Sequence, residues 1–156
     1  MNIRVVAVGK LKEGFWRDAC AEYLKRLGAY ASLEVREVDD RDPGKAGGVP
    51  AALAKEGAAV LGAIPDRSYV ILLSIEGKEL SSEGFSSRLD ALALEGRSDI
   101  AFIIGGPNGV DGQVRARADE ALSFGPMTLP HNLARVVLLE QLYRAFKISR
   151  NEPYHK

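Results

Sequence analysis

Two short runs of large apolar residues constrain the fold of this chain more than any other feature of its sequence. Tyr69 to Leu73 and Ile100 to Ile104 show no alternation between apolar and polar side chains. Strands with one face in solvent alternate, whereas strands buried on both faces of a parallel sheet are apolar throughout. The two runs therefore predict central strands of a parallel sheet that is covered by helices on both sides.

Segments with strand and helix periodicity alternate along the rest of the chain, as a parallel sheet requires. A β-rich run from Ile3 to Gly9 predicts the first strand, and the strict alternation from Leu33 to Val38 predicts a strand at a sheet edge. Asp39 to Gly48, rich in aspartate and glycine, is predicted to be a loop. The predicted fold class is α/β, a mainly parallel sheet flanked by helices, in a single domain over residues 1–156.

Four helices are predicted from apolar spacing and from their end signals. The first follows the first strand and places Trp16, Ala19, Cys20, Tyr23 and Leu27 at helical spacing. The other three run from Pro50 to Pro65, from Ser81 or Ser82 to Gly96, and from about Asn132 to Ser149. The last helix is apolar on most sides, so most of its surface must be covered. This favours packing both on the chain's own sheet and on a second copy of the chain, with simple core burial as the alternative.

The net charge of the whole chain is zero, but the basic and acidic residues are unevenly distributed along it. The 156 residues carry 21 basic and 21 acidic side chains, which does not resemble a nucleic-acid coat protein. Met127 to Lys156 nevertheless contains five basic residues against two acidic ones, a net charge of +3. This segment can meet phosphates, or it can be the solvated face of an ordinary helix.

Several classes of protein are disfavoured by what the sequence lacks. The first residues lack the basic start and long apolar run of a signal peptide, and no run reaches the roughly 20 apolar residues of a membrane helix. We therefore expect a cytoplasmic protein without membrane contact. The two histidines and the scattered carboxylates predict no metal site. His131 is expected to cap or pack the last helix, and Cys20, the only cysteine, to fill the core.

Two loops rich in glycine and proline are the best candidates for a ligand site. Gly105 to Gly109 follows a buried strand directly, and Phe124 to Pro130 forms the second loop. Parallel α/β sheets bind ligands at the carboxyl ends of their strands, and glycine lets the backbone approach a ligand closely. The second loop offers backbone amides and carbonyls, which suit an adenine in an apolar slot. The usual fingerprints are missing, because Phe15 stands where a phosphate loop needs lysine and no G-x-G-x-x-G follows a strand.

Four blocks of sequence together resemble the SPOUT methyltransferases, and within them the ribosomal RNA large subunit methyltransferase H family. The blocks are Ile103 to Gly109, Leu122 to His131, Leu142 to Phe146, and Asn151 to Lys156. Weaker similarity extends over the whole chain. Each block alone is unspecific, whereas the combination is specific.

This resemblance implies a fold and an activity. The C-terminal part of the sheet is expected to be threaded into a trefoil knot, an arrangement nearly absent from other proteins. The chain is expected to form a homodimer and to transfer a methyl group from S-adenosylmethionine, without a metal. The implied substrate is a pseudouridine in the 23S rRNA of the large subunit, methylated at N3 in the assembled ribosome.

The resemblance also implies which residues form the site. S-adenosylmethionine is expected to contact Leu73, Gly105, Gly106, Phe124, Gly125, Pro126, Met127, Thr128 and Leu129. The acceptor nitrogen carries a proton that must be removed, or charge on the ring carbonyls must be stabilised. Candidates for these tasks are Tyr154 for stacking or hydrogen bonding to the base, His155 for accepting the proton, and Arg144 for a phosphate or carbonyl contact.

Two alternatives from other classes stay open at this point. A non-enzymatic ribosome- or RNA-binding module would use the same basic C-terminal segment and would have no affinity for S-adenosylmethionine. A different α/β enzyme would bind ATP or NAD at the same strand ends, although the missing phosphate fingerprints disfavour it.

Overall fold

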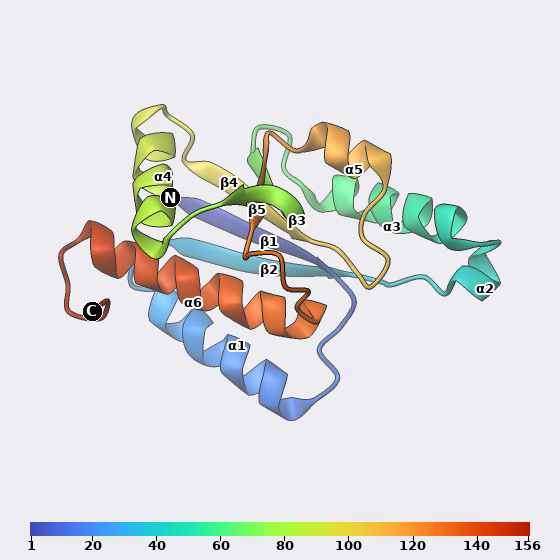
Figure 1. The fold of residues 1–156 in the computed structure, drawn as a ribbon, viewed down its shortest axis with the longest axis horizontal. Coiled ribbons are helices and arrows are strands. Elements are labelled where there is room, and N and C mark those ends of the chain that lie inside the picture. Colours follow the sequence, from blue (N-terminus) through green and yellow to red (C-terminus); the bar gives the residue numbers. More distant parts are fainter.

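The fold is a five-stranded parallel sheet with helices on both faces, seen in a computed structural model that describes all residues 1–156 (Figure 1). The strands are β1 (Asn2–Val8), β2 (Ser32–Val38), β3 (Tyr69–Glu79), β4 (Asp99–Ile104) and β5 (Glu120–Ser123). Their order across the sheet is β2-β1-β4-β3-β5, and every neighbouring pair is parallel. The predicted α/β class is therefore confirmed, and β2 lies at an edge as its alternation predicted.

Six helices cover the sheet. They are α1 (Gly14–Leu27), α2 (Pro43–Ala46), α3 (Val49–Ala63), α4 (Ser82–Leu94), α5 (Gly112–Arg117) and α6 (His131–Ser149). Figure 1 shows α1 and α6 side by side, with α4 near the far end of α6 and with α3 and α5 on the other side of the sheet. None of these helices is both long and apolar enough to span a membrane.

The core has two parts, one on each face of the sheet. The larger part joins inward-facing strand residues such as Phe102 to α1, α4 and α6. The smaller part joins the opposite faces of the same strands, including Val6 and Ile103, to α3 and α5. The central strands are buried on both faces for this reason, which explains why their sequences are apolar throughout.

The structure corrects the predicted elements in two places. Asp39 to Gly48 contains the short helix α2, capped by the Asp42 side chain, which accepts a hydrogen bond from the Gly44 amide at 2.9 Å. The segment between the two glycine and proline loops, for which no element was predicted, contains α5 and β5. Both are too short for a periodic pattern to emerge, and β5 is held mainly by its pairing with β3.

Helix α6 packs between α1 and α4, and this packing accounts for most of its apolar surface. Leu138, Leu139, Leu142 and Ala145 are fully buried within the chain. Leu133 and Val136 are only half-buried. The alternative of simple core burial therefore explains the centre of the helix, and contact with a second copy stays a prediction for the rest.

Strand β3 is longer than the apolar run that predicted it, because it bulges and then pairs with β5 again. Leu73 and Lys78 both align with Leu122, so the residues between them form a bulge. Gly77 lies in this bulge against β5. A Cβ atom at Gly77 would come within 2.6 Å of the Ala121 carbonyl carbon and 2.7 Å of the Leu122 amide nitrogen.

We predict that Gly77→Ala destabilises the protein because neither backbone atom can move without breaking the β3–β5 pairing. The free energy of unfolding should fall by about 1 to 3 kcal/mol, the usual range for overpacking. Urea unfolding followed by circular dichroism measures this change. Gly62→Ala in α3 is the matched control, because a Cβ atom there meets nothing within 4 Å. It should leave stability equal or raise it by about 0.4 to 1 kcal/mol. Equal stability of both variants would contradict the prediction.

Candidate active site

A cavity of about 760 Å³ opens at the carboxyl ends of the central strands. We call it the strand-end cavity. Its walls come from the ends of β3 and β4, the glycine loop after β4, the loop after β5 and the first turn of α6. Its volume is that of a site for a small molecule or cofactor, and its place is the one where parallel α/β sheets bind ligands.

The glycine loop forms a wall of backbone because side chains do not fit there. A Cβ atom at Gly105 would lie 2.7 Å from Val110 Cγ1 and 2.9 Å from the Gly109 carbonyl oxygen. The loop after β5 turns at Gly125, which has φ of 111° and whose amide donates to Ser123 Oγ at 3.0 Å. Both loops therefore present main-chain donors and acceptors to the cavity, a lining suited to a nucleoside.

The residues predicted to hold a cofactor are brought together in this cavity, with one exception. The lining includes Leu73, Gly105, Gly106, Phe124, Gly125, Met127, Thr128 and Leu129. Pro126 is exposed and does not line it. Proline has no amide hydrogen, so Pro126 could not have offered a main-chain donor to a ligand.

Sequence reasoning missed some of the lining and misjudged one residue. Ile75 and Glu76 line the cavity directly after the apolar part of β3, where the strand-end rule could have found them. Arg115 lines it from α5, a helix that was not predicted. His131 also lines the cavity and makes no capping hydrogen bond, since the N-cap of α6 is Pro130. The expected capping role of His131 is therefore wrong.

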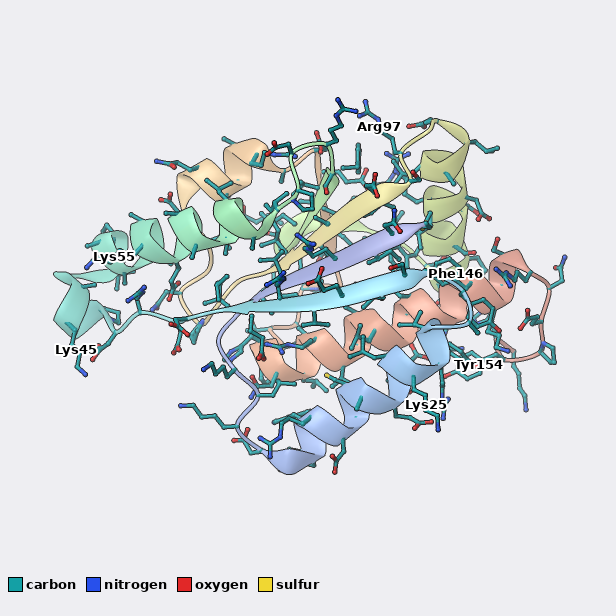
Figure 2. All side chains as sticks on the ribbon, turned by 180° about the vertical axis from the view of Figure 1, so that it is seen from behind. Lys25, Lys45, Lys55, Arg97, Phe146 and Tyr154 are labelled. Atoms are coloured by element: carbon teal, nitrogen blue, oxygen red, sulfur yellow. The ribbon has the colours of Figure 1, made fainter.

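The three predicted catalytic residues form a second group at the other end of α6. Arg144 Nη1 lies 3.1 Å from His155 Nδ1, and the Arg144 guanidinium lies over the Tyr154 ring at 4.7 Å. Two carboxylates that were not predicted complete the group, which we call the tail cluster: Glu83, Glu140, Arg144, Tyr154 and His155. Figure 2 shows labelled Tyr154 near Phe146 and Lys25, at the end of the molecule opposite Lys45 and Lys55.

Glu140 organises the tail cluster by accepting from two partners with one oxygen. Its Oε1 lies 2.5 Å from Arg144 Nη2 and 3.1 Å from Tyr154 Oη. Burial raises the pKa of Tyr154 to about 12, and the hydrogen bond to Glu140 acts in the same direction. The Glu140 hydrogen bond also raises the pKa of Arg144. At neutral pH Tyr154 is therefore a protonated phenol, able to donate a hydrogen bond but not to act as a base.

His155 connects the tail to α4. Its Nε2 lies 2.7 Å from Glu83 Oε1, and this contact lowers the pKa of the Glu83 carboxyl. One ring nitrogen thus faces a carboxylate while the other faces Arg144. Glu83 lies 72 residues before His155 in the chain, so only the tertiary structure could bring this partner into the cluster.

The turn that leads into the tail is held by Glu152. Its Oε2 accepts from Tyr30 Oη at 2.5 Å and from Lys147 Nζ at 2.8 Å, while its amide donates to the Lys147 carbonyl at 2.9 Å. The hydrogen bond from Lys147 lowers the pKa of Glu152 and raises that of Lys147. The direction in which Pro153 and Tyr154 leave the helix is fixed by these contacts.

The structure does not bring the strand-end cavity and the tail cluster together within one chain. His131 begins α6 and lines the cavity, whereas Arg144 lies near its other end. Thirteen residues of α-helix separate them, which corresponds to about 20 Å. Among residues 1–156, no group of three or more His, Cys, Asp or Glu side chains is placed to hold a metal ion.

Comparisons with known proteins agree with this architecture. Residues 1–155 match the family described as "Predicted SPOUT methyltransferase". Proteins named "Ribosomal RNA large subunit methyltransferase H" from Bacillus cytotoxicus and Bacillus thuringiensis are each 51% identical to this chain, over all of both chains. The structure of a probable methylase family protein from Haemophilus influenzae superposes with a TM-score of 0.54 and 13% identity, covering 96% of this chain and 66% of that one. This last likeness concerns the fold alone.

A parallel sheet with a backbone-lined cavity at its strand ends is the architecture of an α/β protein that binds a small molecule. The comparisons make the class more specific. The chain belongs to the SPOUT methyltransferases, and within them to the ribosomal RNA large subunit methyltransferase H family.

We predict that Tyr154 titrates near pH 12, because its buried phenol donates to Glu140. The folded-state pKa lies above the ordinary value of 10.0, so the stability that this group contributes is complete below pH 10.0 and is lost as the pH rises toward 12. Near-ultraviolet phenolate absorbance of the parent minus that of Tyr154→Phe isolates this group. Glu140→Gln should shift the transition back toward pH 10.0. A transition at pH 10.0 in the parent would show that the phenol is neither buried nor held by Glu140.

Proposed function

We propose that this protein transfers the methyl group of S-adenosylmethionine to N3 of a pseudouridine in the 23S rRNA of the large ribosomal subunit. The proposal includes a cytoplasmic homodimer with a trefoil knot in the C-terminal part of the chain. The observation that carries it is the backbone-lined strand-end cavity, formed by the loops that the family resemblance assigns to the cofactor. The full-length 51% identity to proteins named for large-subunit rRNA methylation supports the same substrate.

The lining of the cavity fits S-adenosylmethionine. Main-chain groups of the loop after β5 would hold the adenine, and Leu72 and Leu122 would supply apolar contact. Gly105 packs tightly against Val110 and Gly109 of its own loop, which would keep the backbone of this loop in place against the ligand. Bound there, S-adenosylmethionine supplies a methyl group already activated by its sulfonium. The chain's main contribution is then positioning, which can be worth about 7 to 11 kcal/mol.

The tail cluster supplies the groups that the acceptor base needs. His155 would accept the N3 proton through Nδ1, once the base displaces Arg144 from that nitrogen, because Tyr154 is kept protonated and Arg144 is a cation. Tyr154, kept protonated, would stack on the base, or would turn its one O–H from Glu140 to a ring carbonyl. Arg144, held by Glu140, would stabilise negative charge on a carbonyl or contact a phosphate.

A homodimer would resolve the separation between the cavity and the tail cluster. If two copies of α6 pack antiparallel across a two-fold axis, the tail of one chain comes to the cavity of its partner. The exposed apolar side chains support such a contact, because Ile75 is 52% and Met127 81% exposed at the cavity. Phe15, at the start of α1, is 64% exposed as well. A partner chain that covers these side chains would remove them from water.

The charge on the C-terminal segment supports recognition of the ribosome by shape more than by a broad basic surface. Of its five basic residues, three are paired with carboxylates: Arg135 with Glu37, Arg144 with Glu140 and Lys147 with Glu152. Only Arg150 and Lys156 form no ion pair. Few unpaired cations are left here to bind the phosphates of a free RNA. The shape of the protein surface can instead be complementary to a preformed cleft in the ribosome.

The proposed reaction is tested by transfer of labelled methyl groups to ribosomes from a strain that lacks this protein. Assembled ribosomes should take up label at one pseudouridine, and free subunits or naked rRNA should take up little. Isothermal titration with S-adenosylmethionine accompanies the assay. Absence of label from every substrate would refute the transferase, and absence of binding as well would favour the non-enzymatic RNA-binding module.

We predict that Gly105→Ala weakens binding of S-adenosylmethionine at least about tenfold, or ~1.4 kcal/mol, because the new methyl group displaces the loop that lines the cavity. The clash with Val110 Cγ1 at 2.7 Å is the physical cause. Titration calorimetry measures the affinity. Gly112→Ala is the matched control, since a Cβ atom there meets nothing within 4 Å and Gly112 does not line the cavity. Equal affinities for the two variants would refute the assignment of this loop.

We predict that two impaired variants complement each other when they are mixed and assayed at a concentration of S-adenosylmethionine well below the KM of the parent. Gly105→Ala damages the cavity and His155→Ala the tail, so a mixed dimer has one site with both parts intact. A randomly assorted equal mixture should recover about a quarter of the parent methyl transfer, since half the dimers are mixed and each has one working site. Each variant mixed with itself is the control. No recovery after verified subunit exchange would place cavity and tail of the same chain in one site.

A further inference from the structure

Arg135 is a buried cation whose contacts join three elements around the strand-end cavity. Its side chain is 3% exposed, although its neighbours Ala134 and Val136 in the helix are only half-buried. Arg135 Nη1 lies 2.5 Å from Glu37 Oε2, and Arg135 Nη2 donates to the Gly9 carbonyl at 3.1 Å. Glu37 is near the end of β2, and Gly9 follows β1 directly. One guanidinium therefore ties α6 to the carboxyl ends of two neighbouring strands.

The first turn of α6 has no other fixed polar attachment of this kind. Its N-cap is Pro130, and no side chain caps its free amides. Yet this turn is a wall of the cavity, through His131 and Ala134. His131 Nε2 lies 3.9 Å from where a Cβ atom at Gly9 would be, so the histidine is a neighbour of the strand end that Arg135 holds. A shift at Arg135 would move His131 and Ala134 with it.

Stability alone does not account for this buried pair. Arg135 Nε is buried without a hydrogen-bond partner, and so is Asn132 Oδ1 one turn earlier. Glu37 is 34% exposed, so the pair is buried on one side only. A buried ion pair with an unsatisfied donor is often no more stabilising than apolar residues of the same volume. What the pair uniquely provides is a directional link between the helix and the strand ends.

We propose that Arg135 is a positioning residue for the methyl donor: through Glu37 and the Gly9 carbonyl it sets the first turn of α6 and thereby the width of the cofactor cavity. This inference rests on the proposed function. It assigns to Arg135 a role in binding S-adenosylmethionine and none in contacting RNA, even though Arg135 belongs to the basic C-terminal segment. The effect of removing it should fall on the affinity and KM for S-adenosylmethionine, and not on kcat or on the KM for ribosomes.

The test compares Arg135→Met, which keeps the volume, and Arg135→Lys, which keeps the charge. Arg135→Met should weaken S-adenosylmethionine binding about tenfold and raise its KM equally, with kcat at saturation changed less than about twofold. Arg135→Lys should be intermediate, because one ammonium cannot hold both partners in the forked geometry of a guanidinium. In the ligand-free protein, the imidazole NMR signal of His131 should shift in both variants, and the signal of His155 should not. With only two histidines in the chain, the signals are readily assigned.

Arg88→Met is the control for general destabilisation. Arg88 is 29% exposed and pairs with Glu120 at 3.1 Å on a part of the sheet that does not line the cavity. It should leave the affinity for S-adenosylmethionine and the His131 signal unchanged. If it weakens binding as much as Arg135→Met does, or if Arg135→Met binds within about twofold of the parent, the inference is overturned.

A further variant keeps the test decisive if Arg135→Met does not fold. Glu37→Gln removes only the charge of a half-exposed partner and keeps an oxygen acceptor. It should weaken binding about threefold and shift the His131 signal, and unchanged values for both would overturn the inference. Failure of the parent protein to bind S-adenosylmethionine would refute the proposed function itself. That outcome is distinct from parent binding that survives in every variant, which refutes the role of Arg135 alone.

Discussion

The pairing of β3 with strands on both sides is the constraint on which the rest of the structure depends. β3 lies beside β4 on one side and β5 on the other, all parallel. Parallel strands end at the same edge of a sheet, so the segments that follow Leu73, Ile104 and Ser123 meet there. The cavity is the space enclosed by these segments. Without β5, the loop from Phe124 onward would have no fixed place beside the glycine loop.

Helix α6 holds the strand-end cavity and the tail cluster apart. Its first turn lines the cavity, and its last turns carry Arg144 and the anchor of the tail. A rigid helix holds these groups at a constant distance, which a flexible linker would not. The arrangement makes each chain incomplete for the proposed reaction. It gives the proposed dimer a chemical reason, because the groups assigned to the methyl donor and those assigned to the base lie at opposite ends of one helix.

Carboxylates reduce the positive charge that the basic C-terminal segment presents to solvent. Glu140 and Glu152 neutralise Arg144 and Lys147 while holding the tyrosines in place, so the tail has fixed geometry and little free charge. This favours a tail that positions one base over a tail that attracts RNA from a distance. Burial, together with the hydrogen bond to Glu140, keeps the Tyr154 phenol protonated. The electrostatics of the segment follow from its partners, and its net charge of +3 is a poor guide to its surface.

The sequence by itself determined the parallel α/β class, the edge position of β2 and the loops around the cavity, because apolar runs, alternation and glycine-rich turns act over a few residues. It also determined the family, through blocks whose combination is specific. The tertiary structure alone decided that β5 exists, that His131 lines the cavity and that Glu83 meets His155. These features depend on contacts between residues far apart in the chain, and short-range patterns carry no record of such contacts. The distance between cavity and tail was decided in the same way, by the course of one helix across the fold.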